Sequence, residues 1–174
     1  MGETFFIADT HFGHRGVIKF GDTYKYRPFD TIEEHDEELV RRWNSVVGRN
    51  DVVYVLGDFC FGSRNLFRAG LCNGLKKLVM GNHDTYPSRD YLKYFQKLHG
   101  AVEYKGMILA HIPAHPSQFP RYSINIHGHL HHLQVQDTRY VNVSAEQINL
   151  TPISYDDIRS VLKNGDALVD GLRG

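Results

Sequence analysis

The feature of this sequence that most restricts its fold is a set of short apolar runs, each of which ends in polar side chains. The runs read TFFIADTH, DVVYVLGD, KKLVMGNHD, GMILAH and SINIHGHLH. Each is rich in β-branched, aromatic or aliphatic residues, a composition that is typical of buried strands. The polar residues at their ends are all of types that bind metal ions or transfer protons. The pattern therefore predicts a β-rich core with chemistry at the strand ends.

Helical patterns separate several of the runs. Thr31 and Glu34 form a capping box, and the residues that follow carry one apolar stripe at helical spacing. Ser154 is a second N-cap candidate, with Asp157 three residues later. The predicted helices cover residues 31–47, 63–71, 89–98 and 154–165.

The order of these elements predicts the fold class. Strands alternate with helices over roughly the first hundred residues, which predicts parallel β-α-β units. From Ala101 to Val143 strand follows strand, as expected for a mixed sheet or for a second sheet packed on the first. We find no internal repeat and no linker, so we expect an α/β fold in a single domain over residues 1–174.

Composition excludes several classes of function. Lys plus Arg and Asp plus Glu each number 20, so the formal net charge is zero, which argues against binding to long nucleic acid. The two cysteines are too few for a disulfide framework or a cysteine-based zinc site, and they fit a reducing compartment. The chain enters a predicted strand almost at once, and no apolar run approaches membrane-spanning length. We therefore expect a cytoplasmic protein that does not contact membranes.

Seven oxygen and nitrogen donors are predicted at the strand ends. Residues i and i+2 of an extended chain point to the same side, so Asp9 and His11 can face one ion, and His129 and His131 repeat the spacing. Gly128, which precedes the second pair, is expected to allow a tight turn. Mixed carboxylate and imidazole donors suit Mn, Fe, Zn, Ni or Co and do not select among them. The seven candidate metal ligands are Asp9, His11, Asp58, Asn82, His111, His129 and His131.

The order of these donors resembles the calcineurin-like metallophosphoesterase superfamily. The blocks of that superfamily are D-x-H, G-D, G-N-H-D, H and G-H-x-H, and all five occur here in the same order. They read Asp9-Thr10-His11, Gly57-Asp58, Gly81-Asn82-His83-Asp84, His111 and Gly128-His129-Leu130-His131, and the match spans about residues 5–144. The extension F-G-H after the first block resembles a small bacterial and phage branch. Residues 152–174 lie beyond the match and are predicted to form a helix and tail.

The resemblance implies a fold of mixed β-sheets packed as a sandwich with flanking helices, in the order αββα, and a site for two divalent ions. By resemblance, the first ion is held by Asp9, His11, Asp58 and His131. Asp58 bridges to the second ion, which Asn82, His111 and His129 complete. A metal-bridging hydroxide then attacks phosphorus in line. The resemblance makes His83 the general acid, and Asp84 is a candidate to orient it.

Three further residues are candidates for substrate binding. His14 lies in the 12–29 loop and could touch phosphate or the first ion, with an ordinary loop histidine as the alternative. Arg27 lies in the same loop and could grip a phosphate, although a solvated position is the favoured reading. His115 could reach the site from the 112–122 loop, with a surface position slightly favoured. These loops and the 84–88 loop follow predicted strands, so they are expected to form the walls of a pocket.

The residues that depart from larger relatives narrow the substrate class. The chain carries GDFCFG where protein phosphatases of the superfamily have a longer block ending Asp-Arg-Gly, and it has no room for the extra region of the DNA nucleases. We therefore expect a phosphodiesterase that acts on small phosphoesters such as nucleotides. A phosphomonoesterase, a nuclease for short nucleic acid and a non-catalytic scaffold stay open as alternatives. The natural substrate, the native metals and the oligomeric state also stay open.

Overall fold

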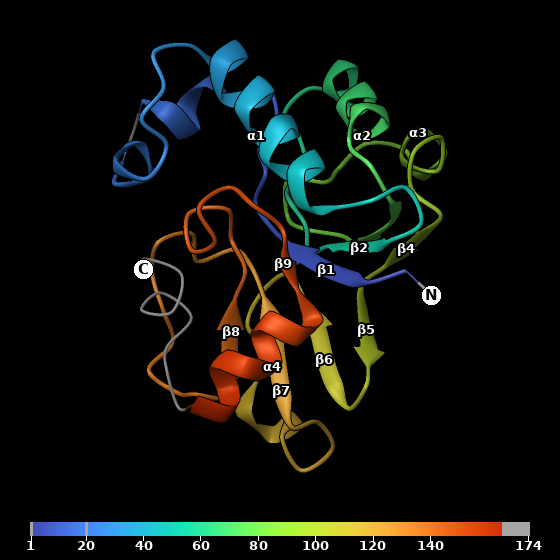
Figure 1. The fold of residues 1–174 in the computed structure, drawn as a ribbon, viewed down its shortest axis with the longest axis vertical. Helices are drawn as coiled ribbons and strands as arrows, with labels where there is room; N and C mark the ends of the chain where they lie inside the picture. The colour runs from blue at the N-terminus through green and yellow to red at the C-terminus, as the bar shows by residue number, and fades with distance from the viewer. Residues whose placement is uncertain (1, 20, 165–174) are drawn as a thin grey trace.

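The computed structural model describes residues 2–19 and 21–164, and two β-sheets form its centre (Figure 1). The first sheet has the strand order β4-β3-β2-β1-β9, and the second has the order β5-β6-β7-β8. The strands are β1 (Thr4–Ile7), β2 (Val52–Val55), β3 (Leu75–Val79), β4 (Lys97–His99), β5 (Ala101–Tyr104), β6 (Met107–Ala110), β7 (Ile124–His127), β8 (Tyr140–Asn142) and β9 (Ile153–Ser154).

Strands β1 to β4 of the first sheet are parallel, as the alternation of strands and helices predicts. Strand β9 joins the sheet antiparallel to β1. Helices cover the outer face of this sheet, at the top of Figure 1. The helices and 3₁₀ turns are η1 (Arg15–Ile18), η2 (Thr23–Lys25), α1 (Ile32–Val46), η3 (Ser63–Phe67), α2 (Arg68–Leu71), α3 (Ser88–Tyr91), η4 (Pro116–Gln118) and α4 (Tyr155–Asn164).

The second sheet packs against the other face of the first. Strands β5 and β6 form an antiparallel pair, while β6, β7 and β8 run parallel. Aromatic rings join the sheets: the ring of Phe6 on β1 lies 5.7 Å from that of Tyr104 on β5 and 5.9 Å from that of Tyr54 on β2. Helix α4 lies beside the second sheet (Figure 1), where Tyr155 contacts Tyr104 edge-on. The αββα sandwich is therefore confirmed.

The predicted helix starts are confirmed, but one helix is shorter than predicted. Thr31 and Glu34 form the expected capping box, and the N–H of Asp157 donates to the Ser154 hydroxyl. Residue 165, the predicted end of the last helix, lies outside the described residues. The prediction of one helix over residues 89–98 is wrong in its second half, because Lys97–His99 forms β4 and pairs with β3. Strand pairing with a distant segment overrides the local helical pattern there.

The chain keeps forming backbone hydrogen bonds beyond the strand ends. The N–H of Asp9 donates to the Gly57 carbonyl at 3.0 Å, and the N–H of His11 donates to the Asp58 carbonyl at 3.0 Å. Ala8 pairs with Ser144 as an isolated parallel bridge, which joins the end of β1 to the segment after β8. These bonds bring the loops of both sheets together at one end of the sandwich.

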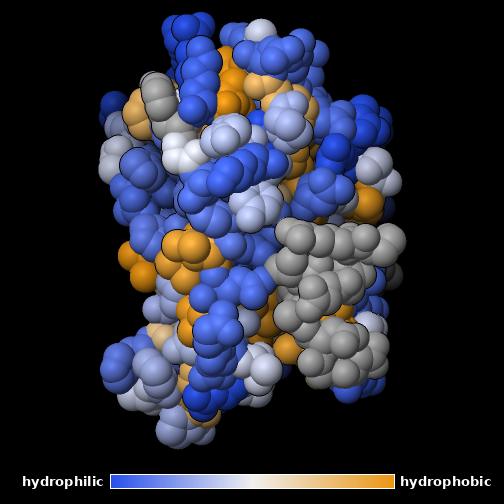
Figure 2. Space-filling model, turned by 90° about the vertical axis from the view of Figure 1, so that its left-hand side faces the viewer, coloured by the Kyte–Doolittle hydropathy of each residue, from blue (hydrophilic) through white to orange (hydrophobic). Residues whose placement is uncertain are grey.

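The surface at the left of Figure 1 is largely hydrophilic, with small separate groups of hydrophobic side chains (Figure 2). Within the described part of the chain, no helix has both the length and the apolar character that a membrane span requires.

Candidate metal centre

Six of the seven predicted ligands lie in two groups of three, in loops that follow strands of both sheets. In each group, one potential ligand atom from every residue lies within 4.8 Å of the others. Because the carboxyl ends of parallel strands meet at one edge of a sheet, residues far apart in sequence become neighbours here. The first group is Asp9, His11 and His131, and the second group is Asp58, His111 and His129.

Asp58 lies between the two groups. Its Oδ2 atom is 3.4 Å from Nε2 of His111 in the second group and 3.8 Å from Nε2 of His11 in the first. Its Oδ1 atom accepts a hydrogen bond of 2.9 Å from the N–H of His83. The seventh predicted ligand, Asn82, also reaches the second group, with Oδ1 2.9 Å from His111 Nε2. One carboxylate oxygen therefore faces both groups.

The backbone at five of the seven predicted ligands is left-handed, not extended. The prediction that Asp9 and His11 face one side because they are i and i+2 of a strand gives the right neighbours for the wrong reason. Asp and His tolerate this conformation better than most residues, but each such position is strained. Backbone strain of this kind clusters at functional sites. The positive φ angles are 54° at Asp9, 50° at His11, 54° at Asp58, 70° at His129 and 50° at His131.

Glycines before the ligands provide room for close backbone approach. The tight turn predicted at Gly128 is present, because the N–H of Leu130 donates to the Gly128 carbonyl at 2.8 Å. The position is also crowded: a Cβ atom there would lie 2.4 Å from the Ala8 Cβ and 2.5 Å from Asp9 Oδ2. A Cβ atom on Gly81 would lie 2.2 Å from Asp58 Oδ1. Any larger residue would therefore displace a metal-site carboxylate.

Hydrogen bonds behind the imidazoles direct their Nε2 atoms toward the other predicted ligands. Nδ1 of His111 lies 2.8 Å from the carbonyl oxygen of Leu56, which can only accept a hydrogen bond, so this nitrogen carries the proton. Nδ1 of His131 lies 2.9 Å from Oε1 of Glu146, which fixes its proton in the same way. Such partners commonly orient histidines that bind metals.

Two ligand atoms of the first group are buried without a hydrogen-bond partner among the described residues. They are Asp9 Oδ1 and His11 Nε2. Burial raises the pKa of Asp9 to about 6, and burial together with the charge of Arg27 lowers the pKa of His11 well below its usual value. At neutral pH the group therefore presents a carboxylate and a neutral imidazole. Unpaired buried polar atoms are costly, and divalent cations would satisfy them, so the residues fit a metal site.

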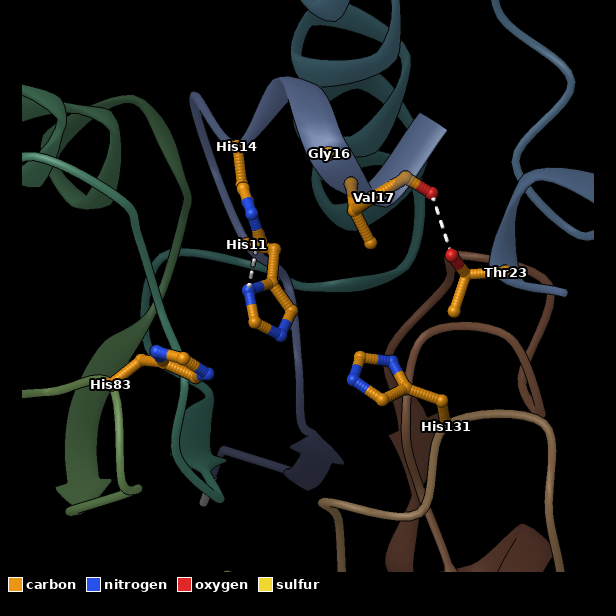
Figure 3. Close-up of a pocket in the computed structure, with 7 residues that line it drawn as sticks. All are labelled: His11, His14, Gly16, Val17, Thr23, His83 and His131. Atoms are coloured by element: carbon orange, nitrogen blue, oxygen red, sulfur yellow. Dashed lines mark hydrogen bonds between the residues drawn. The ribbon is translucent and has the colours of Figure 1, made fainter. Parts of the chain in front are cut away.

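A pocket of about 280 Å³ opens beside these groups. The rings of His11, His83 and His131 surround its floor, and residues of η1 and η2 form the opposite wall (Figure 3). The lining residues are His11, His14, Gly16, Val17, Thr23, His83 and His131.

Comparison with known proteins explains why these residues occur in this order. The family of calcineurin-like phosphoesterases matches residues 4–168. The chain belongs to this family. It is 33% identical over 178 residues to an uncharacterized protein of Methanocaldococcus jannaschii, a match that covers 95% of this chain and 94% of that one.

Two further proteins are similar to this chain. A structure of a protein of unknown function from Aquifex aeolicus has a TM-score of 0.72 and 25% identity, covering 92% of this phosphoesterase-family chain and all of the other. The gene 66 protein of Mycobacterium phage L5 is 37% identical over 89 residues, or 48% of this chain and 41% of the phage protein. The family resemblance predicted from the motif blocks is confirmed.

His83 lies at the pocket of this family member, but Asp84 does not orient it. The His83 ring lines the pocket with its centroid 5.7 Å from that of His11. Asp84 is buried, and both of its carboxylate oxygens accept hydrogen bonds from backbone N–H groups. The predicted orienting role is therefore wrong, and Asp84 instead joins the β2 and β3 loops. The donors are Asp58 at 2.7 Å, Gly81 at 2.9 Å and Phe59 at 3.1 Å.

Arg27 is neither in a solvated loop nor in contact with the pocket. Its side chain is fully buried, and Nε donates to Oε1 of Glu146 at 2.8 Å. The guanidinium also donates to the carbonyl oxygens of Asp9 and Thr10 and lies 2.9 Å from Nε2 of His35. Both sequence readings of Arg27 are wrong, because a buried carboxylate and three further acceptors satisfy its charge. Arg27 therefore supports the first group through its contacts with Glu146 and with the Asp9 carbonyl.

Of the other two substrate-binding candidates, one lies at the pocket and the other does not. His14 lines the pocket, and its Nδ1 lies 3.2 Å from Nδ1 of His11, so it contacts a predicted ligand directly (Figure 3). His115 is exposed and caps η4, where its Nδ1 accepts from the N–H of Ser117. The structure therefore brings His14 to the site but does not place His115 in the pocket lining.

Two residues that sequence reasoning missed complete the surroundings of the first group. The Ser144 hydroxyl donates to Oδ2 of Asp9 at 2.8 Å, and Glu146 contacts both His131 and Arg27. A sequence pattern could have identified both residues as site candidates, because VNVSAE is one more apolar run that ends in polar residues.

Proposed function

We propose that this family member is a two-metal phosphodiesterase that hydrolyses small phosphoesters such as nucleotides. The observation that carries the proposal is that a single atom, Oδ2 of Asp58, faces both ligand groups. When bound, two divalent ions would supply a nucleophile at neutral pH and neutralise charge on the phosphate. A site built only to stabilise the fold would close around one ion with four ligands.

The chain's own residues would hold the ions and position the substrate. Asp9, His11 and His131 would hold one ion, and His111, His129 and Asn82 the other, with Asp58 shared. These side chains come from strained, hydrogen-bonded loops, so their geometry is set before substrate arrives. Preorganised ligands of this kind are what transition-state stabilisation requires.

The pocket supports a small substrate with little negative charge. Its volume of about 280 Å³ is at the low end of the range for small-molecule sites. No lysine or arginine is among its described lining residues. A phosphomonoester carries more negative charge than a diester and would gain more from such a cation, so the lining favours a diester.

His83 is our candidate for the proton donor to the leaving oxygen. Its ring is exposed at the pocket, while its N–H is fixed by Oδ1 of Asp58. General acid catalysis typically contributes about 10²- to 10⁴-fold. We expect His83→Ala to lower the rate on alkyl diesters by this amount and to affect 4-nitrophenyl esters much less, because their leaving groups need no proton. Equal losses on both substrates would assign His83 to binding instead.

The decisive experiment combines metal content with activity. Protein reconstituted with Mn, Ni or Zn should hold about two ions per chain. It should hydrolyse bis(4-nitrophenyl) phosphate faster than 4-nitrophenyl phosphate. Asp58→Asn should lose both ions and the activity, whereas Asp137→Asn, which alters a partly exposed carboxylate paired with Arg139, should keep them.

Three outcomes would overturn parts of this proposal. Absence of metal after reconstitution would exclude the two-metal site. Faster hydrolysis of the monoester would make the protein a phosphomonoesterase. Two bound ions without hydrolysis of any mono- or diester, cyclic nucleotide or short oligonucleotide would leave the scaffold function.

A further inference from the structure

An exposed phenylalanine stands against the rings that line the pocket. Phe61 is 50% exposed. Its ring stacks on that of His14, with centroids 4.6 Å apart and an angle of 15° between the planes. It also meets the ring of His83 edge-on at 6.4 Å. Phe61 therefore extends the aromatic side of the pocket outward.

The backbone holds Phe61 in a fixed position relative to the metal site. Its N–H donates to the carbonyl of Phe12 at 2.8 Å, and its own carbonyl accepts from Nδ2 of Asn65 at 2.6 Å. It follows Asp58 by only three residues, in the same hydrogen-bonded loop. The ring is thus a fixed surface whose place is set by the loop that carries the shared carboxylate.

A second exposed phenylalanine, Phe67, has different surroundings from Phe61. Phe67 is 47% exposed, close to the value for Phe61, and it lies against Arg68, whose guanidinium carbon is 5.3 Å from its ring centroid. Single exposed apolar residues of this kind are normal on protein surfaces. Phe61 differs because two residues that line the pocket touch it, so its exposed ring adjoins the space that a substrate would enter.

We propose that Phe61 and His14 form a stacking site for an aromatic group carried by the phosphoester, such as a nucleobase. This inference rests on the proposed function and names its substrate class. The described pocket lining supplies no lysine or arginine to hold the substrate by charge, so stacking is an available source of affinity beyond the metal ions. Aromatic side chains bind bases of every type in this way.

The test uses two ligands that differ only by a base: thymidine 5′-monophosphate and 2-deoxyribose 5-phosphate. Their affinities for the Mn-loaded protein are measured by calorimetry, without requiring turnover. We expect the nucleotide to bind more tightly to the unaltered protein. Phe61→Ala should weaken nucleotide binding by about five- to a hundredfold and leave the sugar phosphate unchanged. Phe61→Trp should preserve the difference, and so should the matched control Phe67→Ala.

The outcomes separate this inference from the proposed function. Equal affinities in the unaltered protein, or an equal loss for both ligands in Phe61→Ala with Phe61→Trp failing to restore the difference, would overturn the stacking site. Hydrolysis assays on the same samples report on the proposed function independently. A protein that hydrolyses diesters without discriminating between the two ligands keeps the proposed function and loses the stacking site.

Discussion

The two ligand groups differ in what lies behind their imidazoles. In the first group, His131 is hydrogen-bonded to the Glu146 carboxylate, which in turn pairs with the buried Arg27. In the second group, His111 is hydrogen-bonded to the carbonyl oxygen of Leu56. Side chains therefore support one group, and backbone supports the other.

This difference indicates what determines the metal affinity of each group. The charge of Arg27 and the hydrogen bond from His131 hold the pKa of Glu146 far below its usual range against the effect of burial, so the carboxylate stays ionised. An anionic partner makes an imidazole a stronger metal ligand than a neutral carbonyl does. Burying an ion pair is costly, so its presence behind a metal ligand suggests that the pair serves the site. The second group instead depends on the position of the chain after β2.

Replacing one histidine in each group should have the largest effect on metal content and activity. His131→Ala and His129→Ala should each hold about one ion instead of two, because each removes a ligand of one group only. Both should lose hydrolysis, because the proposed reaction needs both ions. Elemental analysis after gel filtration measures the ions. His132→Ala is the control: this half-buried residue stacks on Tyr26 outside both groups and should keep two ions. If His131→Ala and His129→Ala each lost both ions, the two groups would be one site.

The ligand positions could be predicted because they follow from rules that hold along the chain. Buried strands can be recognised by composition, and parallel strands bring their carboxyl ends together. Asp9, Asp58 and His111 lie 49 or more residues apart in the sequence, yet each immediately follows a strand or its short extension. The sequence therefore indicated which side chains would meet.

The supporting contacts could not be predicted, because they depend on tertiary position. Arg27 and Glu146 are 119 residues apart, and a charged residue in a loop is most often solvated. The left-handed backbone at Asp9 and Asp58 has no local sequence signal, since neither residue is a glycine. Strand β4 likewise exists only because β3 is available for pairing.

Neutralising Glu146 should produce a smaller and selective effect. Glu146→Gln keeps an oxygen that can accept the Nδ1 proton of His131 but removes the negative charge. We expect the first ion to bind about 10- to 100-fold more weakly and the second ion to bind as before, as measured by calorimetry. Glu38→Gln, which alters a carboxylate on α1 paired with Arg41, should change neither.

The alternative for Glu146 is a purely structural role beside Arg27. In that case Glu146→Gln would lower the melting temperature and weaken both ions alike. Glu146→Asp would then restore stability without restoring the difference between the two groups.

The second group should show a dependence of metal binding on pH. Burial alone would lower the pKa of His111, but its hydrogen bond with Asp58 and the charges of Asp9 and Asp58 raise it to about 9. The metal-free protein therefore keeps a proton on His111 up to about pH 9, and an ion must displace it. In His131→Ala, where only the second group remains intact, affinity should rise about tenfold per pH unit up to about pH 9 and then level off. Calorimetry in two buffers of different ionisation enthalpy should detect one proton released per ion at neutral pH and none above about pH 9. Absence of release at neutral pH would mean that His111 is already neutral before the ion binds, and that Asp58 does not hold its proton.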